Sequence, residues 1–485
     1  MSLSADQHLA RGRQLLNDGQ PGAAIRDYLA ANALQPANPQ AALGLGMALS
    51  LAGRHGEARI ALEHALTLAP ENSDYAFALA EAHKRAGNRG TAEKIYRQIL
   101  HFEPQHLMSA HNLGALLYDE ERFAEAAERH LATLNDHPAS IATWRDLGQS
   151  LIAAGRLEDG ITTLEIADQT FPDDRETRFA LGLAYLRNEE WSKGWPLYEA
   201  RWQAGEQSPT PPGTAFWAGQ PLTGKHLVIT REQGFGDNIM FVRYLPHLAR
   251  EAAHITLLPP APLAILFAES FSQLGNVSIV TTPAAVPAAD FCTAIGALPG
   301  HCLARGLSAP PCLIPYLRTP PERLSAARQA LQRRAPEAGQ KLGLVWRGNH
   351  GYGADRQRSL ALGELLGQLP TAGVRYFNLQ LGINANERRL LNDAGVFDLS
   401  AEISGFHDTA AWLGALDGLL CVDTAIAHLA GALARPTRLL GRREGEWRWG
   451  RAQDGRAWYT TLFPGKIGEA ALFDHGATIA FPQNN

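Results

Sequence analysis

The first half of the chain repeats a pattern of small and helix-breaking positions every 34 residues. Five prolines keep this interval, and a small residue stands 24 and again 12 positions before each of them. Small residues at these two places let paired helices approach closely, and the proline ends the second helix before the next repeat begins. The pattern therefore predicts about six helix pairs over residues 4–207. The positions are Pro36, Pro70, Pro104, Pro138 and Pro172, preceded by Gly12, Gly46, Ala80, Gly114 and Gly148 and by Ala24, Ala58, Ala92, Ala126 and Gly160.

Hydrophobic runs of strand length alternate with helical stretches in the second half, which predicts two α/β lobes. Residues 208–224 are rich in proline and glycine and predict a linker. We expect a first lobe over residues 225–318, a helix-containing connector over 319–340 and a second lobe over 341–485. The expected strands are HLVIT, HITLLPP and SIVTT in the first lobe and KLGLVWRGN, VRYFNLQ, GLLCVD and PTRLLG in the second.

An acid follows a Gly-Phe-Gly turn in the segment ITREQGFGDNIMFVRYLPHLAR. A short apolar strand precedes the turn, and hydrophobic residues at helical spacing follow it. This order places Asp237 at the carboxyl edge of a sheet, where α/β proteins bind ligands. Two interpretations are open. Asp237 either caps the helix, since Asp is a preferred N-cap, or acts as a catalytic base that faces a cleft.

A second strand–helix junction, in CVDTAIAHLAGAL, predicts an anion site. A buried strand ends at Asp423 and Thr424, and a helix of small residues follows at once. The backbone N–H groups of Thr424, Ala425 and Ile426 would point outward with the helix dipole behind them, which suits a phosphate or diphosphate. The alternative is that Asp423 and Thr424 only cap the helix. His428 lies one turn into the helix, where a histidine is more often packed in the core than catalytic.

A glycine-rich loop after the first strand of the second lobe carries three arginines beside Ser359. Arginine side chains can hold phosphate oxygens with two parallel hydrogen bonds. Arg347, Arg356 and Arg358 are therefore candidates for binding a diphosphate. A solvated basic loop is the alternative, above all for Arg356.

Composition narrows the classes of function. The 485 residues are 45% hydrophobic and 19% charged, with a net charge of −5, which predicts a folded, soluble chain without general attraction to nucleic acid. The N-terminus lacks the apolar core of a signal peptide, and no run has the length of a transmembrane helix. We therefore expect a cytoplasmic protein with no transmembrane segment.

The sequence shows no spacing typical of a metal or dinucleotide site. Gly234 and Gly236 begin a G-x-G-x-x-G motif, but Ile239 stands at the third glycine. The chain has no phosphate loop of the Walker type, no H-E-x-x-H motif and no closely paired cysteines. Its four cysteines do not make a disulfide framework. No metal and no cofactor is expected.

Each half of the chain resembles a known protein family, and these resemblances make the expectations more specific. The 34-residue period resembles the tetratricopeptide repeat, whose stacked helix pairs form a groove for a protein or peptide. In the second half, REQGFGDNIMFVRYLP, LVWRGN…DRQRSL, FNLQLG and CVDTAIAHLAGAL…WRW…WY resemble, in this order, the heptosyltransferase-like glycosyltransferase family 9. This resemblance covers most of residues 225–465. It implies a GT-B fold of two Rossmann-like lobes, an acceptor lobe before a nucleotide-sugar lobe, and an inverting, metal-independent transfer.

The family resemblance also implies roles for matching residues. Asp237 corresponds to the acid that deprotonates the acceptor hydroxyl. Arg358 lies near the basic residue that neutralises the leaving diphosphate, and Asp423, Thr424 and Ala425 match the segment that holds the donor's phosphates and sugar. The remaining candidates are Gln380, where the donor lobe approaches the nucleotide, and Arg347, His428 and Gly236.

Two functions from different classes follow. The first is a glycosyltransferase that moves a sugar from a nucleotide-diphosphate donor to a protein or glycan acceptor, while the repeats recruit the acceptor or a partner. The second is an adaptor whose repeats bind a partner and whose transferase domain has lost turnover. In the first case a base must act on one side of the sugar, and without a metal the arginines and a helix N-terminus must stabilise the leaving diphosphate.

Overall fold

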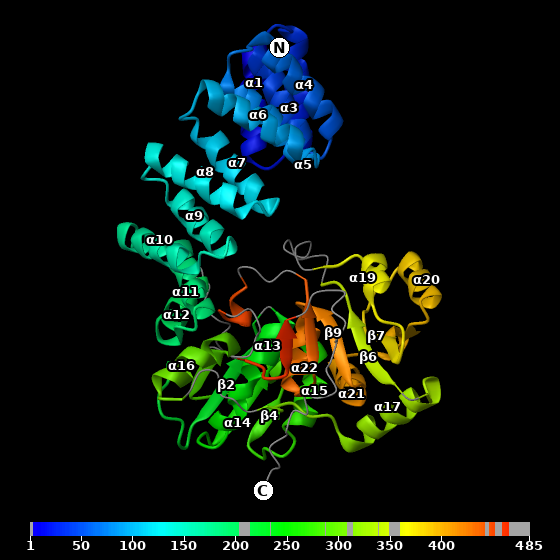
Figure 1. Cartoon of the computed structure of the whole chain (residues 1–485). Coiled ribbons are helices and arrows are strands. Elements are labelled where there is room, and N and C mark those ends of the chain that lie inside the picture. Colours follow the sequence, from blue (N-terminus) through cyan, green and yellow to red (C-terminus); the bar gives the residue numbers. More distant parts are fainter. Residues whose placement is uncertain are drawn as a thin grey trace. The chain divides into compact units, whose positions relative to one another are not determined.

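A computed structural model describes residues 3–202, 214–232, 234–286, 288–307, 314–337, 339–348, 359–441, 446–451 and 458–464. The chain forms two compact units, Met1–Thr177 and Arg178–Asn485, called here the repeat unit and the α/β unit (Figure 1). Within the described residues, no helix is both long enough and apolar enough to cross a bilayer.

The repeat unit is a stack of helix pairs, which confirms the fold predicted from the 34-residue period (Figure 1). In each pair the second helix ends two residues before one of the five periodic prolines, because the residue before a proline avoids helical geometry. The pairs are α1 (Ala5–Asn17) with α2 (Pro21–Leu34), α3 (Pro39–Leu51) with α4 (His55–Leu68), α5 (Ser73–Arg85) with α6 (Arg89–Phe102), α7 (Leu107–Asp119) with α8 (Phe123–Asp136), and α9 (Ile141–Ala153) with α10 (Leu157–Thr170).

The small residues of the first helices permit the close packing that the sequence predicted. A Cβ atom added at Gly46 would lie 2.4 Å from Cγ of Leu62 on α4, and one added at Gly148 would lie 2.6 Å from Cγ of Leu164 on α10. Any larger residue at these positions would therefore push the two helices of a pair apart.

The first sheet of the α/β unit is parallel, with strand order β1-β5-β2-β3-β4. The chain moves outward from β2 to β4 and then returns to the other side of β2 to form β5. The strand order therefore reverses between β2 and β5. The strands are β1 (Ala215–Phe216), β2 (His226–Thr230), β3 (His254–Leu258), β4 (Val277–Ile279) and β5 (Phe291–Ala294).

The second sheet is also parallel, with strand order β11-β10-β9-β6-β7-β8. Here the order reverses between β6 and β9, which lie side by side at the centre. These two parallel sheets confirm the predicted α/β class. The strands are β6 (Gln340–Val345), β7 (Val374–Asn378), β8 (Phe397–Asp398), β9 (Gly418–Val422), β10 (Thr437–Leu440) and β11 (Leu462–Pro464).

The second sheet is covered on both faces, as the alternation of its buried residues requires. Val345, Leu419 and Cys421 enter a large core that also contains residues of the first sheet, whereas Leu344 and Leu420 enter a smaller core on the opposite face. The helices of the unit are α11 (Arg175–Arg187), α12 (Trp191–Tyr198), α13 (Phe235–Phe241), α14 (Leu245–Leu248), α15 (Ala264–Ser270), α16 (Leu298–Ala304), α17 (Pro321–Arg334), α19 (Leu362–Gln368), α20 (Ala385–Asp393), α21 (Phe406–Ala415) and α22 (Ala425–Ala432).

The sixth helix pair, α11 and α12, belongs largely to the α/β unit. Trp195 on α12 is 1% exposed and makes edge-to-face ring contacts with Phe241, Trp447 and Trp458. The boundary between compact units thus falls at Thr177, whereas the repeat period continues to residue 207. The segment predicted as a linker contains β1, which extends the first sheet beyond β5.

Candidate functional site

The carboxyl edge of the second sheet brings together three of the predicted site segments. Arg347 follows β6, Gln380 follows β7 and Asp423 follows β9, and these parallel strands are neighbours. In open α/β sheets, ligands bind outside the carboxyl ends of strands at the point where the strand order reverses. That point lies here between β6 and β9, between Arg347 and Asp423.

The N-terminus of α22 has no side-chain cap. Thr424 is the N-cap residue in an extended conformation, but its side chain makes no capping hydrogen bond. Its Oγ1 atom is buried and has no hydrogen-bond partner in the described part of the chain. Such an orphan hydroxyl beside first-turn N–H groups is costly unless a ligand accepts from it. Asp423 and Ala425 flank Thr424 and are partly buried.

Arg347 and Gln380 contact each other, and the guanidinium of Arg347 is already bound to other protein groups. The side-chain Oε1 of Gln380 accepts from the backbone N–H of Arg347 at 3.2 Å. The guanidinium of Arg347 contacts Glu387 at 3.0 Å and donates to the carbonyl of Gly382 at 2.6 Å. A phosphate at Arg347 would therefore compete with a carboxylate. Arg356 and Arg358 lie outside the described residues.

His428 and Gly236 join the two lobes of the α/β unit. A Cβ atom at Gly236 on α13 would lie 2.7 Å from Cδ2 of His428 on α22, so only glycine permits this approach. The His428 ring stacks on Trp449, and its Nδ1 lies 3.0 Å from the hydroxyl of Tyr459. His428 is a packed core histidine, the alternative noted from the sequence.

Asp237 does not cap α13. The N-cap residue is Gly234, and Asp237 is the third residue of the helix. Its Oδ1 accepts from Nε of Arg448 at 2.7 Å and lies 2.7 Å from Nη2 of the same guanidinium. The capping interpretation is therefore wrong. The acid is an ion-pair partner with one fifth of its side chain exposed.

Arg448 is bound by two carboxylates at once. Its Nη1 donates to Glu446 at 2.7 Å, and its guanidinium lies 4.7 Å from the centre of the Trp447 ring. Burial alone would lower the pKa of Arg448, but the carboxylates of Asp237 and Glu446 raise it well above its ordinary value. Arg448 belongs to the Trp-Arg-Trp segment, whose resemblance to the transferase family implied no role for this arginine.

A second ion-pair cluster, also missed from the sequence, follows β2. Glu232 accepts from Nη2 of Arg201 at 2.8 Å, and Arg201 also contacts Glu199 at 2.6 Å. A Cβ atom on Gly296, just after β5, would lie 2.6 Å from Oε1 of Glu232. Glu232 therefore occupies the place where the strand order of the first sheet reverses.

Tyr198 connects these two clusters electrostatically. Burial raises the pKa of its phenol, Asp237 raises it further, and Arg448 and Arg201 oppose this rise. Counting Asp237, Glu446, Glu232 and Glu199 against Arg448 and Arg201, the described charges here sum to −2. This side of the site suits a neutral hydroxylic ligand better than a phosphate.

Comparisons with known proteins support the assignment of the N-terminal repeats. Models of the tetratricopeptide repeat match residues 49–117 and, in a second form, residues 9–73 and 145–209. The N-terminal region therefore contains tetratricopeptide repeats. Among curated proteins, the chain is 27% identical over 507 residues to Protein FlbA of Caulobacter vibrioides, a match that spans 90% of this chain and 82% of that protein.

Solved structures match part of the chain. A tetratricopeptide repeat protein from Parabacteroides merdae has a TM-score of 0.37 and 17% identity and covers 42% of this chain and 81% of its own. The APC/C hetero-tetramer Cut9-Hcn1 has a TM-score of 0.35 and 18% identity, with 41% of this chain and 39% of that one covered.

Proposed function

We propose that the α/β unit is a glycosyltransferase that uses a nucleotide-diphosphate sugar, with its two lobes arranged as in a GT-B fold. The observation that carries this proposal is the buried, partnerless hydroxyl of Thr424 at the start of α22, where the strand order of the second sheet reverses. A nucleoside diphosphate supplies the acceptor oxygens and negative charge that such a site lacks.

On the donor side, the first-turn N–H groups of α22 and the Thr424 hydroxyl would bind the diphosphate. They would stabilise the negative charge that grows on the diphosphate as the anomeric C–O bond breaks and the electron pair leaves with it. Asp423 carries a charge of the same sign as the phosphates, so its role is to accept hydrogen bonds from sugar hydroxyls. Arg358 would add a cation from the loop after β6.

On the acceptor side, Asp237 would remove the proton of the attacking hydroxyl. The oxygen of that acceptor hydroxyl then forms the new bond to the anomeric carbon. In the structure both contacts with Arg448 fall on one carboxylate oxygen of Asp237, Oδ1. The other oxygen, Oδ2, would take the proton of the acceptor hydroxyl, while Arg448 stays bound to Oδ1 and to Glu446.

The tetratricopeptide repeats would bind the protein that carries or accompanies the acceptor. Stacked helix pairs present an extended surface of this kind. The first two pairs also enclose a hollow of ≈ 340 Å³ whose lining includes Leu29 on α2 and Ile60 on α4. Both side chains are more than half exposed, so apolar surface is available to a partner.

An adaptor without turnover is the second candidate, and the Asp237–Arg448 ion pair favours it. A carboxylate held permanently by arginine is a structural group, and the repeats would then supply the whole function. The two candidates differ in whether the α/β unit binds and converts a nucleotide-sugar.

Replacing Thr424 with valine separates a ligand site from a helix cap. We expect the free energy of unfolding to stay the same or rise, because the hydroxyl that is lost has no partner in the described structure. We also expect the affinity for a nucleoside diphosphate to fall about tenfold or more, because a hydrogen bond to a charged group is worth about 1.5–3 kcal/mol. Thermal unfolding with and without nucleotide measures both quantities.

Thr409→Val is the matched control. Thr409 lies in the first turn of α21, and its hydroxyl donates to the carbonyl of Gly405 at 3.3 Å. This variant should lose some stability and keep its nucleotide affinity. Equal affinity in Thr424→Val and the unaltered protein would show that the hydroxyl contacts no ligand.

A further inference from the structure

The repeat unit is built from layers in which one side chain packs between two first helices. Tyr28 on α2 shows the arrangement, since Cβ atoms added at Gly12 on α1 and at Gly44 on α3 would lie 2.9 Å and 2.1 Å from its ring. The three positions are 16 residues apart, and the 34-residue period repeats them along the chain. The fourth layer consists of Gly114, His130 and Asp146.

This fourth layer replaces apolar and small residues with groups that bind metals. His130 stands where the second and fifth layers have Leu62 and Leu164. Asp146 stands where the corresponding layers have Ala78 and Ala180. Packing therefore does not require ionisable side chains at either position, because the second and fifth layers form without them.

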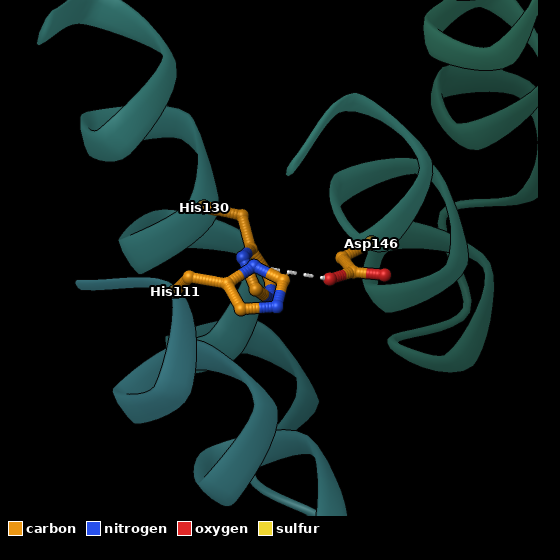
Figure 2. Close-up of side chains that lie close together, drawn as sticks. All are labelled: His111, His130 and Asp146. Atoms are coloured by element: carbon orange, nitrogen blue, oxygen red, sulfur yellow. Dashed lines mark ion pairs between the residues drawn. The ribbon is translucent and has the colours of Figure 1, made fainter. Parts of the chain in front are cut away.

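A third group, His111 on α7, completes the cluster. One ligand atom each from His111, His130 and Asp146 can be chosen so that all lie within 4.8 Å of one another. Nδ1 of His111 is 3.4 Å from Oδ2 of Asp146, and the two imidazole rings have centroids 6.2 Å apart. Figure 2 shows the two rings from α7 and α8 and the carboxylate from α9 turned toward one another.

His130 has a buried ring nitrogen to offer to a cation. It is 1% exposed, and its Nδ1 finds no hydrogen-bond partner among the residues that the structure describes. Burial lowers the pKa of His130 to about 4, and the nearby His111 and Arg129 lower it in the same direction. An imidazole nitrogen that carries no proton has a lone pair that can bind a cation.

Asp146 lacks full compensation for its charge. Burial raises its pKa, His111 and Arg145 oppose this rise, and Glu176 adds to it. Arg145 contacts Glu176 at 2.6 Å, so much of its charge is already matched. A divalent cation at the cluster would neutralise the carboxylate directly.

We propose that His111, His130 and Asp146 bind a divalent transition-metal cation of the Zn²⁺ type. Zinc bonds to imidazole nitrogen and carboxylate oxygen at about 2.0–2.2 Å, which places neighbouring ligands of a tetrahedral ion about 3.4 Å apart. The spacing of His111 and Asp146 already has this value. Both side chains remain about a quarter to a third exposed, so water can fill the fourth position.

The proposed site differs from the expectation that the chain holds no metal. It belongs to the repeat unit and uses none of the residues proposed for sugar transfer. Its ligands come from α7, α8 and α9, so the cation would join two consecutive helix pairs. A cation bound there would hold α7, α8 and α9 together and so order this part of the repeat surface.

Zn²⁺ titration of the untagged, full-length protein after treatment with a chelator tests the proposal. We expect calorimetry to show saturable Zn²⁺ binding, with one equivalent of Zn²⁺ per chain bound at this cluster. The thermal midpoint of the helical signal should rise with the logarithm of the Zn²⁺ concentration. His130→Leu and Asp146→Ala introduce the residues that the second and fifth layers use, so both should fold. Each should lose at least about 10–100-fold in affinity, since even the loss of an outer-shell partner costs that much.

His101→Gln is the control, because His101 is an exposed histidine of α6 outside the cluster. It should bind Zn²⁺ at the cluster as the unaltered protein does. Absence of saturable binding, or binding by folded His130→Leu and Asp146→Ala equal to that of the unaltered protein, would overturn the assignment.

Discussion

Asp237→Asn is expected to slow sugar transfer by at least about a hundredfold while leaving the protein folded and able to bind its donor. Asparagine cannot take up the acceptor's proton at neutral pH, but its side-chain oxygen can still accept a hydrogen bond from Arg448. The pair is one fifth exposed on each side, so the stability lost should be on the order of 1 kcal/mol. Release of nucleoside diphosphate from the donor, with affinity followed in parallel, measures the effect.

Glu446→Gln is the matched control for this variant. It removes the other carboxylate bound to Arg448, at the same distance of 2.7 Å, and leaves Asp237 in place. We expect this variant to keep most of its turnover. If both variants lose activity equally, the ion-pair network positions the site and Asp237 is not the base; if Asp237→Asn transfers sugar at the unaltered rate, the carboxylate is structural.

Trp195→Ala is expected to destabilise the α/β unit by about 3–5 kcal/mol, the usual cost of removing a fully buried aromatic side chain. The indole is 1% exposed and fills the space between Phe241, Trp447 and Trp458. Urea unfolding followed by tryptophan fluorescence measures this change. Of the ten tryptophans only Trp144 precedes residue 178, so the signal comes mostly from the α/β unit.

Ile265→Ala serves as the control, because Ile265 lies in the same unit but is 48% exposed. It should change the free energy of unfolding by less than about 1 kcal/mol. A loss of equal size in both variants would mean that α12 does not belong to the core of the α/β unit. The result also decides where a truncated chain can begin, since one that starts after residue 202 lacks Trp195.

The helix pairs could be predicted because their signals are local and repeated. Proline and small residues act on the chain within a few positions, and five copies of the pattern reinforce one another. Most central strands were also predicted, since their apolar runs are long enough to read. β5 was not, although it lies beside β2. The affiliation of α12 with the α/β unit depends on aromatic contacts that no local pattern contains.

Only those residues of the candidate site that follow a strand could be predicted from the sequence. Asp237, Gln380 and Thr424 each follow a strand, which the sequence shows. The partner of Asp237 lies 211 residues away at Arg448, and such a contact is fixed by packing rather than by local spacing. Likewise, the cluster of His111, His130 and Asp146 matches no metal motif and is visible only when the helix pairs are aligned in register.

The position of a bound nucleoside diphosphate tests the central claim most directly. The nucleotide that most raises the thermal midpoint in a panel of nucleotide-sugars should be co-crystallised with the full chain. We expect its diphosphate against the first-turn N–H groups of α22, within hydrogen-bond distance of Oγ1 of Thr424. A nucleotide bound instead to residues 225–318, or no stabilisation by any nucleotide, would contradict the claim that this edge of the second sheet is a donor site.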